Sequence, residues 1–235
     1  MIQALYTAAS GMTAQQKSMD VTANNIANIN TTGYKSKTAG FKDAIYRTMH
    51  TPAEESAENN LQQGHGVLLS DIKTAFTQGP IEETGNPYDF AIFGTGFFAI
   101  ETNEGIRFTR DGSFHRGETG FLLTKDGHYV LDSNRNRIFI PDNTNEDYPS
   151  PGVFEFTNPQ GLSSEGANYY SETEVSGQAA LSGNDEVRKG FLEASNVDTA
   201  EQLTRIIRSQ RAYQVAARAI TTADQMEEIT NNIMR

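Results

Sequence analysis

Apolar residues at both ends of the chain recur with helical spacing. Near the N-terminus, four of them follow one another at intervals of seven residues: Leu5, Met12, Met19 and Ile26. This is the repeat of a helix that packs against another helix. Turn-forming residues cluster around Gly33, which can adopt a positive φ there. We therefore predict that residues 1–34 are mostly a helix.

The C-terminal segment carries a second helical pattern. Residues 198–235 contain no Gly and no Pro, and Asp198 with Glu201 three residues later forms a capping box. The apolar stripe that follows includes Leu203, Ile206, Tyr213, Ile220 and Met226. We predict a helix that starts at the Asp198 cap, within a C-terminal segment over residues 191–235, and pairs with the N-terminal helix as a coiled coil, within or between subunits.

The middle of the chain has a different pattern. Residues 48–197 hold 17 of the 20 Gly and all 7 Pro, and short alternating runs are separated by turn signals. These features predict a compact antiparallel β domain over residues 67–190. Residues 35–66 are more polar and are predicted to be an extended connector. The fold class is therefore α+β.

Charge and composition exclude several classes of protein. The net charge is −11, there is no Cys, and residues 48–197 carry a net charge of −14. Absence of Cys excludes disulfide scaffolds and thiolate metal sites, and the acidic balance argues against nucleic-acid binding. No apolar run is long enough for membrane insertion. The first residues lack a signal-peptide pattern, so the protein stays in the cytosol or leaves by another route.

No motif for catalysis or metal binding is present. The four His residues lack metal-ligand spacing, and the chain has no nucleophile elbow and no phosphate-binding loop. We expect no catalytic residues, no metal and no cofactor, and hence no enzyme. A monomeric cytosolic binding module, whose two helices merely close the fold, remains an alternative.

Three blocks of sequence carry a family resemblance. Residues 24–35 read NNIANINTTGYK after a Ser-Gly pair at 10–11, residues 91–98 and 108–114 form a middle block, and residues 195–198, 210–213 and 222–226 form a third. Together they resemble the flagellar rod, hook and hook-associated protein family. The residues that carry the terminal motifs are Asn24, Asn25, Asn28, Asn30, Gly33, Asn196, Asp198, Gln210 and Arg211.

The resemblance implies a structural subunit of the bacterial flagellar basal-body rod. Such subunits self-assemble helically into a hollow drive shaft that transmits torque and conducts exported subunits. Their terminal helices form the inner tube. The resemblance further implies export across the inner membrane by the flagellar type III apparatus without a cleavable signal peptide. The implied partners are further copies of the chain, other rod and hook axial proteins, and ring proteins.

The subtype within the family is less sharply defined. Residues 41–49 and the acidic stretch that follows resemble the rod-specific insertion of distal rod members. The chain is shorter around residues 141–152, where such members have additional β structure. A proximal rod or hook-type subunit is therefore the alternative.

Overall fold

The computed structural model describes residues 2–48, 62–141, 148–183 and 185–233. The chain divides into two compact units. The first comprises Met1–Ile26, Lys37–Lys73 and Thr199–Arg235, and the second comprises Ala27–Ser36 and Thr74–Asp198. Long helices in the first unit and antiparallel strands in the second confirm the predicted α+β class.

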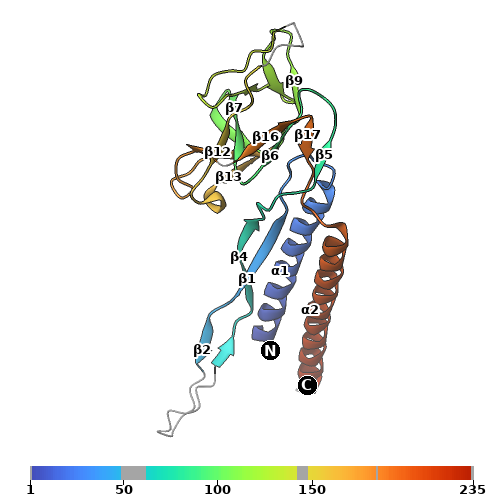
Figure 1. Ribbon diagram of the computed structural model, residues 1–235. Coiled ribbons are helices and arrows are strands. Elements are labelled where there is room, and N and C mark those ends of the chain that lie inside the picture. The colour runs from blue at the N-terminus through green and yellow to red at the C-terminus, as the bar shows by residue number, and fades with distance from the viewer. Residues whose placement is uncertain (1, 49–61, 142–147, 184, 234–235) are drawn as a thin grey trace. The chain divides into compact units, whose positions relative to one another are not determined.

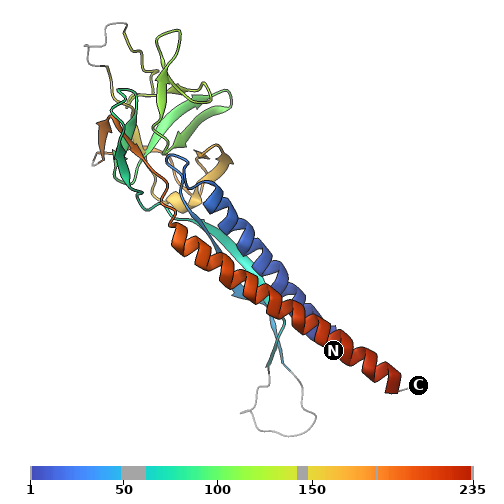
Figure 2. The same cartoon turned by 90° about the vertical axis from the view of Figure 1, so that its right-hand side faces the viewer.

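The first unit is built on two long helices. Helix α1 (Ile2–Ala27) and helix α2 (Thr199–Ile233) lie side by side and run in opposite directions (Figures 1 and 2). Helix α2 begins directly after Asp198, as the capping pattern predicts, and Glu201 lies in its first turn. The longer helix α2 extends past the start of α1 (Figure 2).

A two-stranded ribbon accompanies the helices in the first unit. Strand β1 (Lys37–Asp43) pairs with β4 (Val67–Thr74), and β2 (Tyr46–Thr48) pairs in antiparallel fashion with β3 (Gln62–Gly64). Residues 49–61, the middle of the predicted connector 35–66, lie outside the described residues. Strand β4 leaves Leu68 and Ile72 about half exposed, so this ribbon presents apolar side chains to solvent.

The second unit contains a nine-stranded antiparallel sheet. Its main path runs β13-β14-β8-β7-β11-β10-β9, and β12 pairs with both β7 and β15. The strands are β7 (Phe97–Thr102), β8 (Gly105–Thr109), β9 (Phe114–Arg116), β10 (Leu122–Thr124), β11 (Tyr129–Val130), β12 (Val153–Glu155), β13 (Ser163–Gly166), β14 (Tyr169–Ser171) and β15 (Ala180–Leu181). A short 3-10 helix, η1 (Pro159–Gly161), precedes β13.

The core of the second unit lies on both faces of strand β7. Successive side chains of a strand point to opposite faces, and here both sets are buried. Phe98 and Ile100 belong to one apolar cluster, whereas Phe97 and Ala99 belong to another. The run of buried residues in β7 is therefore continuous and does not alternate with polar ones.

Two further strand pairs complete the second unit. Strand β16 (Glu186–Lys189) pairs with β6 (Phe90–Phe93), and β17 (Phe191–Glu193) pairs with β5 (Ile81–Glu83). Strand β17 ends at Glu193, and Arg110 directly follows β8. Glu193 and Arg110 are both buried, and their side chains are in contact.

Candidate assembly surface and motif junction

Three charged side chains from distant parts of the sequence meet inside the second unit. Lys35 Nζ lies 2.6 Å from Glu193 Oε1, and Arg110 Nη1 lies 3.3 Å from Glu193 Oε2. The Lys35 ammonium also donates to the Thr77 carbonyl at 2.8 Å, and the Gly79 N–H donates to Glu193 Oε1 at 2.8 Å. All three charged residues are buried. We call Lys35, Arg110 and Glu193 the junction triad.

Burial dominates the electrostatics of this triad. Loss of hydration lowers the pKa of Lys35 and that of Arg110, and the Glu193 carboxylate opposes the change in both. Asp185 places a second negative charge near Arg110, so Arg110 faces two carboxylates and Lys35 faces one. Removing one partner of such a group leaves an uncompensated buried charge. The triad is therefore suited to holding three chain segments together.

Gly33 packs directly against the backbone beside the triad. Its φ of +67° confirms the predicted positive φ. A Cβ at this position would lie 2.5 Å from the Arg110 carbonyl carbon and 2.5 Å from the Asp111 nitrogen. The Gly33 N–H donates to the Glu193 carbonyl at 2.8 Å. Gly33 is thus required both for the backbone conformation and for the close approach.

Asn196 joins its own segment to two others in the second unit. Its Oδ1 accepts a hydrogen bond from the Ser36 N–H at 2.7 Å. Its Nδ2 donates to the carbonyl oxygens of Ala75 at 2.8 Å and Thr77 at 3.0 Å. The amide therefore substitutes for backbone pairing where these segments meet.

Asn25 plays the corresponding part in the first unit. It is buried, its Oδ1 accepts from the Lys37 N–H at 2.8 Å, and its Nδ2 donates to the Lys37 carbonyl at 2.7 Å. The same Nδ2 donates to Gln202 Oε1 on α2 at 3.1 Å. One side chain thus ties the end of α1 to β1 and to α2.

Small and polar residues form the buried seam between the two helices. On α2, buried Gln202, Ser209 and Ala223 are separated by multiples of seven, and the half-buried Ala216 completes the series. On α1, the buried residues are Ala14, Thr22 and Asn25. Ser209 also donates to the Ser18 hydroxyl at 3.3 Å. The helices therefore approach closely while burying little apolar surface.

The larger apolar residues predicted to pack between the helices lie beside this seam. Leu5, Met12, Met19, Ile26, Ile206, Tyr213 and Ile220 are partly buried. Leu203 and Met226 are 50% and 49% exposed. Their packing role therefore stays a prediction for the assembled protein.

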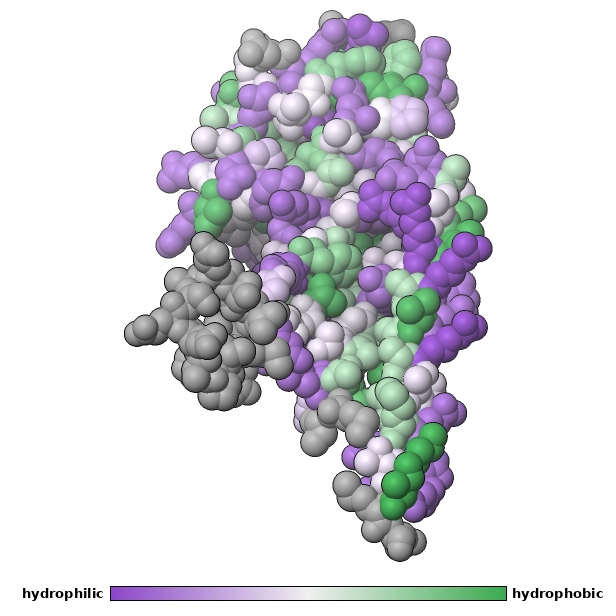
Figure 3. Space-filling model, turned by 90° about the horizontal axis from the view of Figure 1, so that it is seen from below, coloured by the Kyte–Doolittle hydropathy of each residue, from purple (hydrophilic) through white to green (hydrophobic). Residues whose placement is uncertain are grey.

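An uncovered apolar stripe follows one flank of α2. Its members recur at alternating intervals of three and four residues, the spacing of a helix-packing seam: Ala212, Val215, Ala219, Thr222, Met226, Ile229 and Ile233. All seven are exposed, Val215 to 66% and Ile229 to 58%. Figure 3 shows uncovered apolar side chains on the face seen from below. We call this series the α2 stripe.

A groove lies beside the first half of the α2 stripe. It has a volume of about 600 Å³ and is lined by Ala212, Val215 and Ala219 from α2 and by Ala4, Thr7 and Ala8 from α1. Its lining is largely aliphatic and small, so it suits the ridge of another helix rather than a polar ligand.

Comparison with known proteins connects these features to a family. Residues 5–35 match the model of the flagella basal body rod protein, residues 91–148 match the flagellar hook protein FlgE/F/G D1 domain, and residues 188–233 match the flagellar basal body rod FlgEFG protein C-terminal region. The flagellar basal-body rod protein FlgG of Borreliella burgdorferi is 39% identical over 264 aligned residues that cover 100% of both chains. The chain belongs to the flagellar basal-body rod FlgEFG family.

Other relatives support the same assignment. FlgG of Bacillus subtilis is 34% identical over 261 residues, which cover 98% of this chain and 99% of the relative. FlgF of Caulobacter vibrioides is 34% identical over 232 residues, with 93% and 92% covered. As a member of the FlgEFG family, the chain is a structural rod subunit and not an enzyme.

The junction triad draws one residue from each family match. Lys35 ends the N-terminal match, Arg110 lies in the middle match, and Glu193 lies in the C-terminal match. Lys35 and Arg110 stood within the motif blocks of the sequence, but Glu193 did not. The signal that could have revealed it is a lone acid after Phe191 and Leu192 on a short strand.

The other motif residues are not brought together. Asn28 Oδ1 accepts from the Thr31 hydroxyl at 3.2 Å, while Asn24, Asn30, Gln210 and Arg211 are exposed. Within residues 2–48, 62–141, 148–183 and 185–233, no group of three or more His, Asp or Glu could hold a metal ion. Over the same ranges, no helix combines the length and apolar character of a membrane span.

Proposed function

We propose that this rod subunit self-assembles helically into a hollow shaft through its terminal helices. The uncovered α2 stripe carries the proposal, because its seam-like spacing has no partner helix within the described chain. A second copy would supply that partner. Full burial of a Val, Ile or Met side chain stabilises by about 1.5–3 kcal/mol, so several such residues can drive association.

The predicted packing positions fit the same proposal. Leu203 and Met226 are half exposed in the single chain and would gain burial from neighbouring copies. A contact between two different faces of identical subunits generates an open helical filament when its rotation does not close into a ring. We propose that the helical pair forms the inner tube in this way.

The finer functions follow from membership of the family. We propose that the shaft transmits torque, conducts exported subunits, and contacts other rod and hook proteins and the ring proteins. We also propose export through the flagellar type III apparatus. The distal rod subtype is favoured by FlgG relatives that are 34–39% identical over nearly the full chain, with the proximal rod subtype as the alternative.

Charge placed in the α2 stripe tests the proposal. Val215→Asp should prevent sedimentable filaments and abolish swimming when it replaces the native chain in cells. Gln214→Asp is the matched control, because Gln214 is an exposed neighbour outside the stripe. Filaments of normal yield from Val215→Asp would refute the proposed role of the stripe.

A further inference from the structure

Helix α2 has an uneven distribution of charge along its length. After Glu201 in its first turn, it carries Arg205, Arg208, Arg211 and Arg218, and these are followed by Asp224, Glu227 and Glu228. No ion pair joins these acids to any residue in the described part of the chain. The helix therefore presents a basic segment and an acidic segment, which we call the acidic turn.

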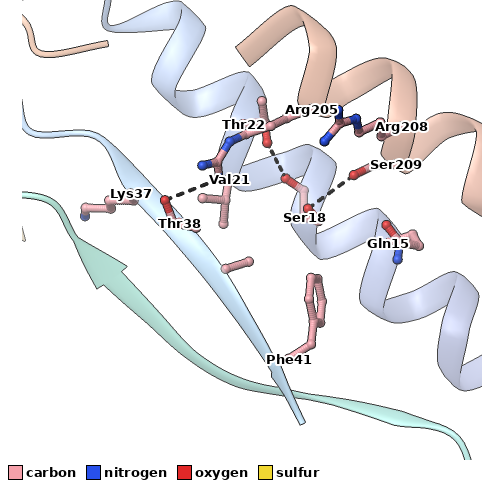
Figure 4. A pocket seen from close by; sticks show the side chains of 11 residues that line it. Gln15, Ser18, Val21, Thr22, Lys37, Thr38, Phe41, Arg205, Arg208 and Ser209 are labelled. Carbon is pink, nitrogen blue, oxygen red and sulfur yellow. Dashed lines mark hydrogen bonds between the residues drawn. The ribbon is translucent and has the colours of Figure 1, made fainter. Parts of the chain in front are cut away.

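The basic segment borders a polar pocket within the first unit. The pocket has a volume of about 190 Å³ and lies between α1, β1 and α2 (Figure 4). Arg205 and Arg208 line its α2 side, Ser18 and Thr38 add hydroxyl groups, and Val21, Ala39 and Phe41 contribute apolar surface. The guanidinium groups of this lining can donate to a carboxylate.

The two arginines differ in their partners. Arg205 Nη2 lies 2.7 Å from Glu201 Oε1, and its Nη1 lies 3.5 Å from the Thr38 hydroxyl. Arg208 forms no ion pair with any described residue and is exposed. The pocket thus retains one uncompensated guanidinium that could bind an acid from outside the unit.

The acidic turn of the same chain cannot reach this pocket. Glu228 follows Arg208 by 20 residues on one continuous helix, which corresponds to about 30 Å at 1.5 Å per residue. The hydrogen bonds from Asn25 to Gln202 and from Ser209 to Ser18 set the antiparallel register of the helices. In that register the acidic turn lies level with the first residues of α1 and beyond them. It is therefore available to another molecule.

We propose that the pocket at Arg208 receives the acidic turn of α2 from a second copy. The inference rests on the proposed function, because it assumes copies that run parallel within one assembly. Charge complementarity identifies the occupant: the pocket offers an unpaired cation, and each copy offers unpaired acids. The two copies are displaced by about 30 Å along the helix axis.

This pairing joins two different faces of identical subunits. Each copy uses its pocket toward one neighbour and its acidic turn toward the other, so the contact repeats without closing. The α2 stripe supplies apolar area, and the Arg208 contact selects the axial displacement. Complementary charges across an interface chiefly fix register and specificity.

Site-directed crosslinking tests the pairing directly. The chain contains no Cys, so any disulfide must come from introduced residues. Arg208→Cys and Glu228→Cys subunits, differently tagged, are mixed, assembled and oxidised. We expect a mixed disulfide whose yield is at least tenfold higher than that from Arg211→Cys with Glu228→Cys. Arg211 is exposed and lies outside the pocket.

Charge reversal provides the second measurement. Arg208→Glu should raise the critical concentration for assembly about tenfold, and combination with Glu228→Arg should restore it to within about twofold; Arg211→Glu should have little effect. Polymers that lack the crosslink, or that form normally from Arg208→Glu, overturn this inference but leave the proposed function intact. A wild-type chain that forms no polymer contradicts the proposed function and this inference with it.

Discussion

Replacing Glu193 with Gln should remove much of the stability of the second unit. The substitution keeps the size of the side chain and deletes the charge that faces Lys35 Nζ at 2.6 Å and Arg110 Nη1 at 3.3 Å. Both cations would stay buried, and Asp185 would oppose the charge of Arg110 only. Breaking a buried ion pair by removing one partner costs about 3–5 kcal/mol.

That magnitude is large beside the total stability of a domain, which is about 5–15 kcal/mol. With a urea dependence of about 2 kcal/mol per molar, the unfolding midpoint should fall by roughly 2 M. Tyrosine fluorescence can report the transition, because the chain contains 9 Tyr and no Trp. Six of these tyrosines lie within the described second unit: Tyr34, Tyr88, Tyr129, Tyr148, Tyr169 and Tyr170.

Glu186→Gln is the matched control for this substitution. Glu186 pairs with Arg188 at 2.8 Å, but the two side chains are 62% and 48% exposed. Solvent screens such an exposed pair, so it contributes little to stability and the midpoint should hardly move. The double variant Lys35→Met/Glu193→Gln should lose less stability than the sum of the losses in the two single variants, because no Lys35 charge is left uncompensated. A Glu193→Gln midpoint equal to that of Glu186→Gln would refute the role of the triad.

Two further substitutions test the second unit. Gly33→Ala should destabilise the second unit by more than the control Gly85→Ala. Gly85 also has a positive φ of +69°, but a Cβ there would meet nothing within 4 Å. The difference in unfolding free energy between the two variants is expected to exceed about 1 kcal/mol in urea unfolding. Burial raises the pKa of Tyr170 from 10.0 to about 12. The folded state therefore keeps a proton that the unfolded state loses, so this contribution to stability is complete below pH 10 and declines toward pH 12, by roughly 3 kcal/mol at most. Tyr170→Phe should reduce that decline in unfolding experiments between pH 9 and 12, and an unchanged decline would contradict the assignment.

The helices could be predicted from the sequence because their signals are local. The capping pattern at Asp198 and the turn around Gly33 lie next to the helix ends, and α2 begins at Thr199 as expected. The residues that form the seam between the helices are harder to predict from the sequence. The predicted heptad consists of large residues such as Met12, whereas the buried positions are small or polar, as at Ala14. Small residues are common in any helix, so their spacing carries little signal without the partner.

The junction triad could not be predicted for a different reason. Its members are separated by 75 and 83 positions along the chain, and each stands in a different segment of sequence. A charged residue usually indicates a solvated surface, and only the folded second unit shows that Lys35, Arg110 and Glu193 are buried together. Pairing between remote positions is a property of topology, which local periodicity does not encode.

The two units differ in how far their charged and apolar side chains find partners within the chain. In the second unit, the buried charges of the triad face opposite charges and backbone partners within the chain. In the first unit, α2 leaves an apolar stripe and Arg208 without partners among the described residues. In the proposed assembly, the free energy of covering these groups would be released when another copy binds. A single chain should consequently open its terminal helices more readily than its second unit, and assembly should reverse that order.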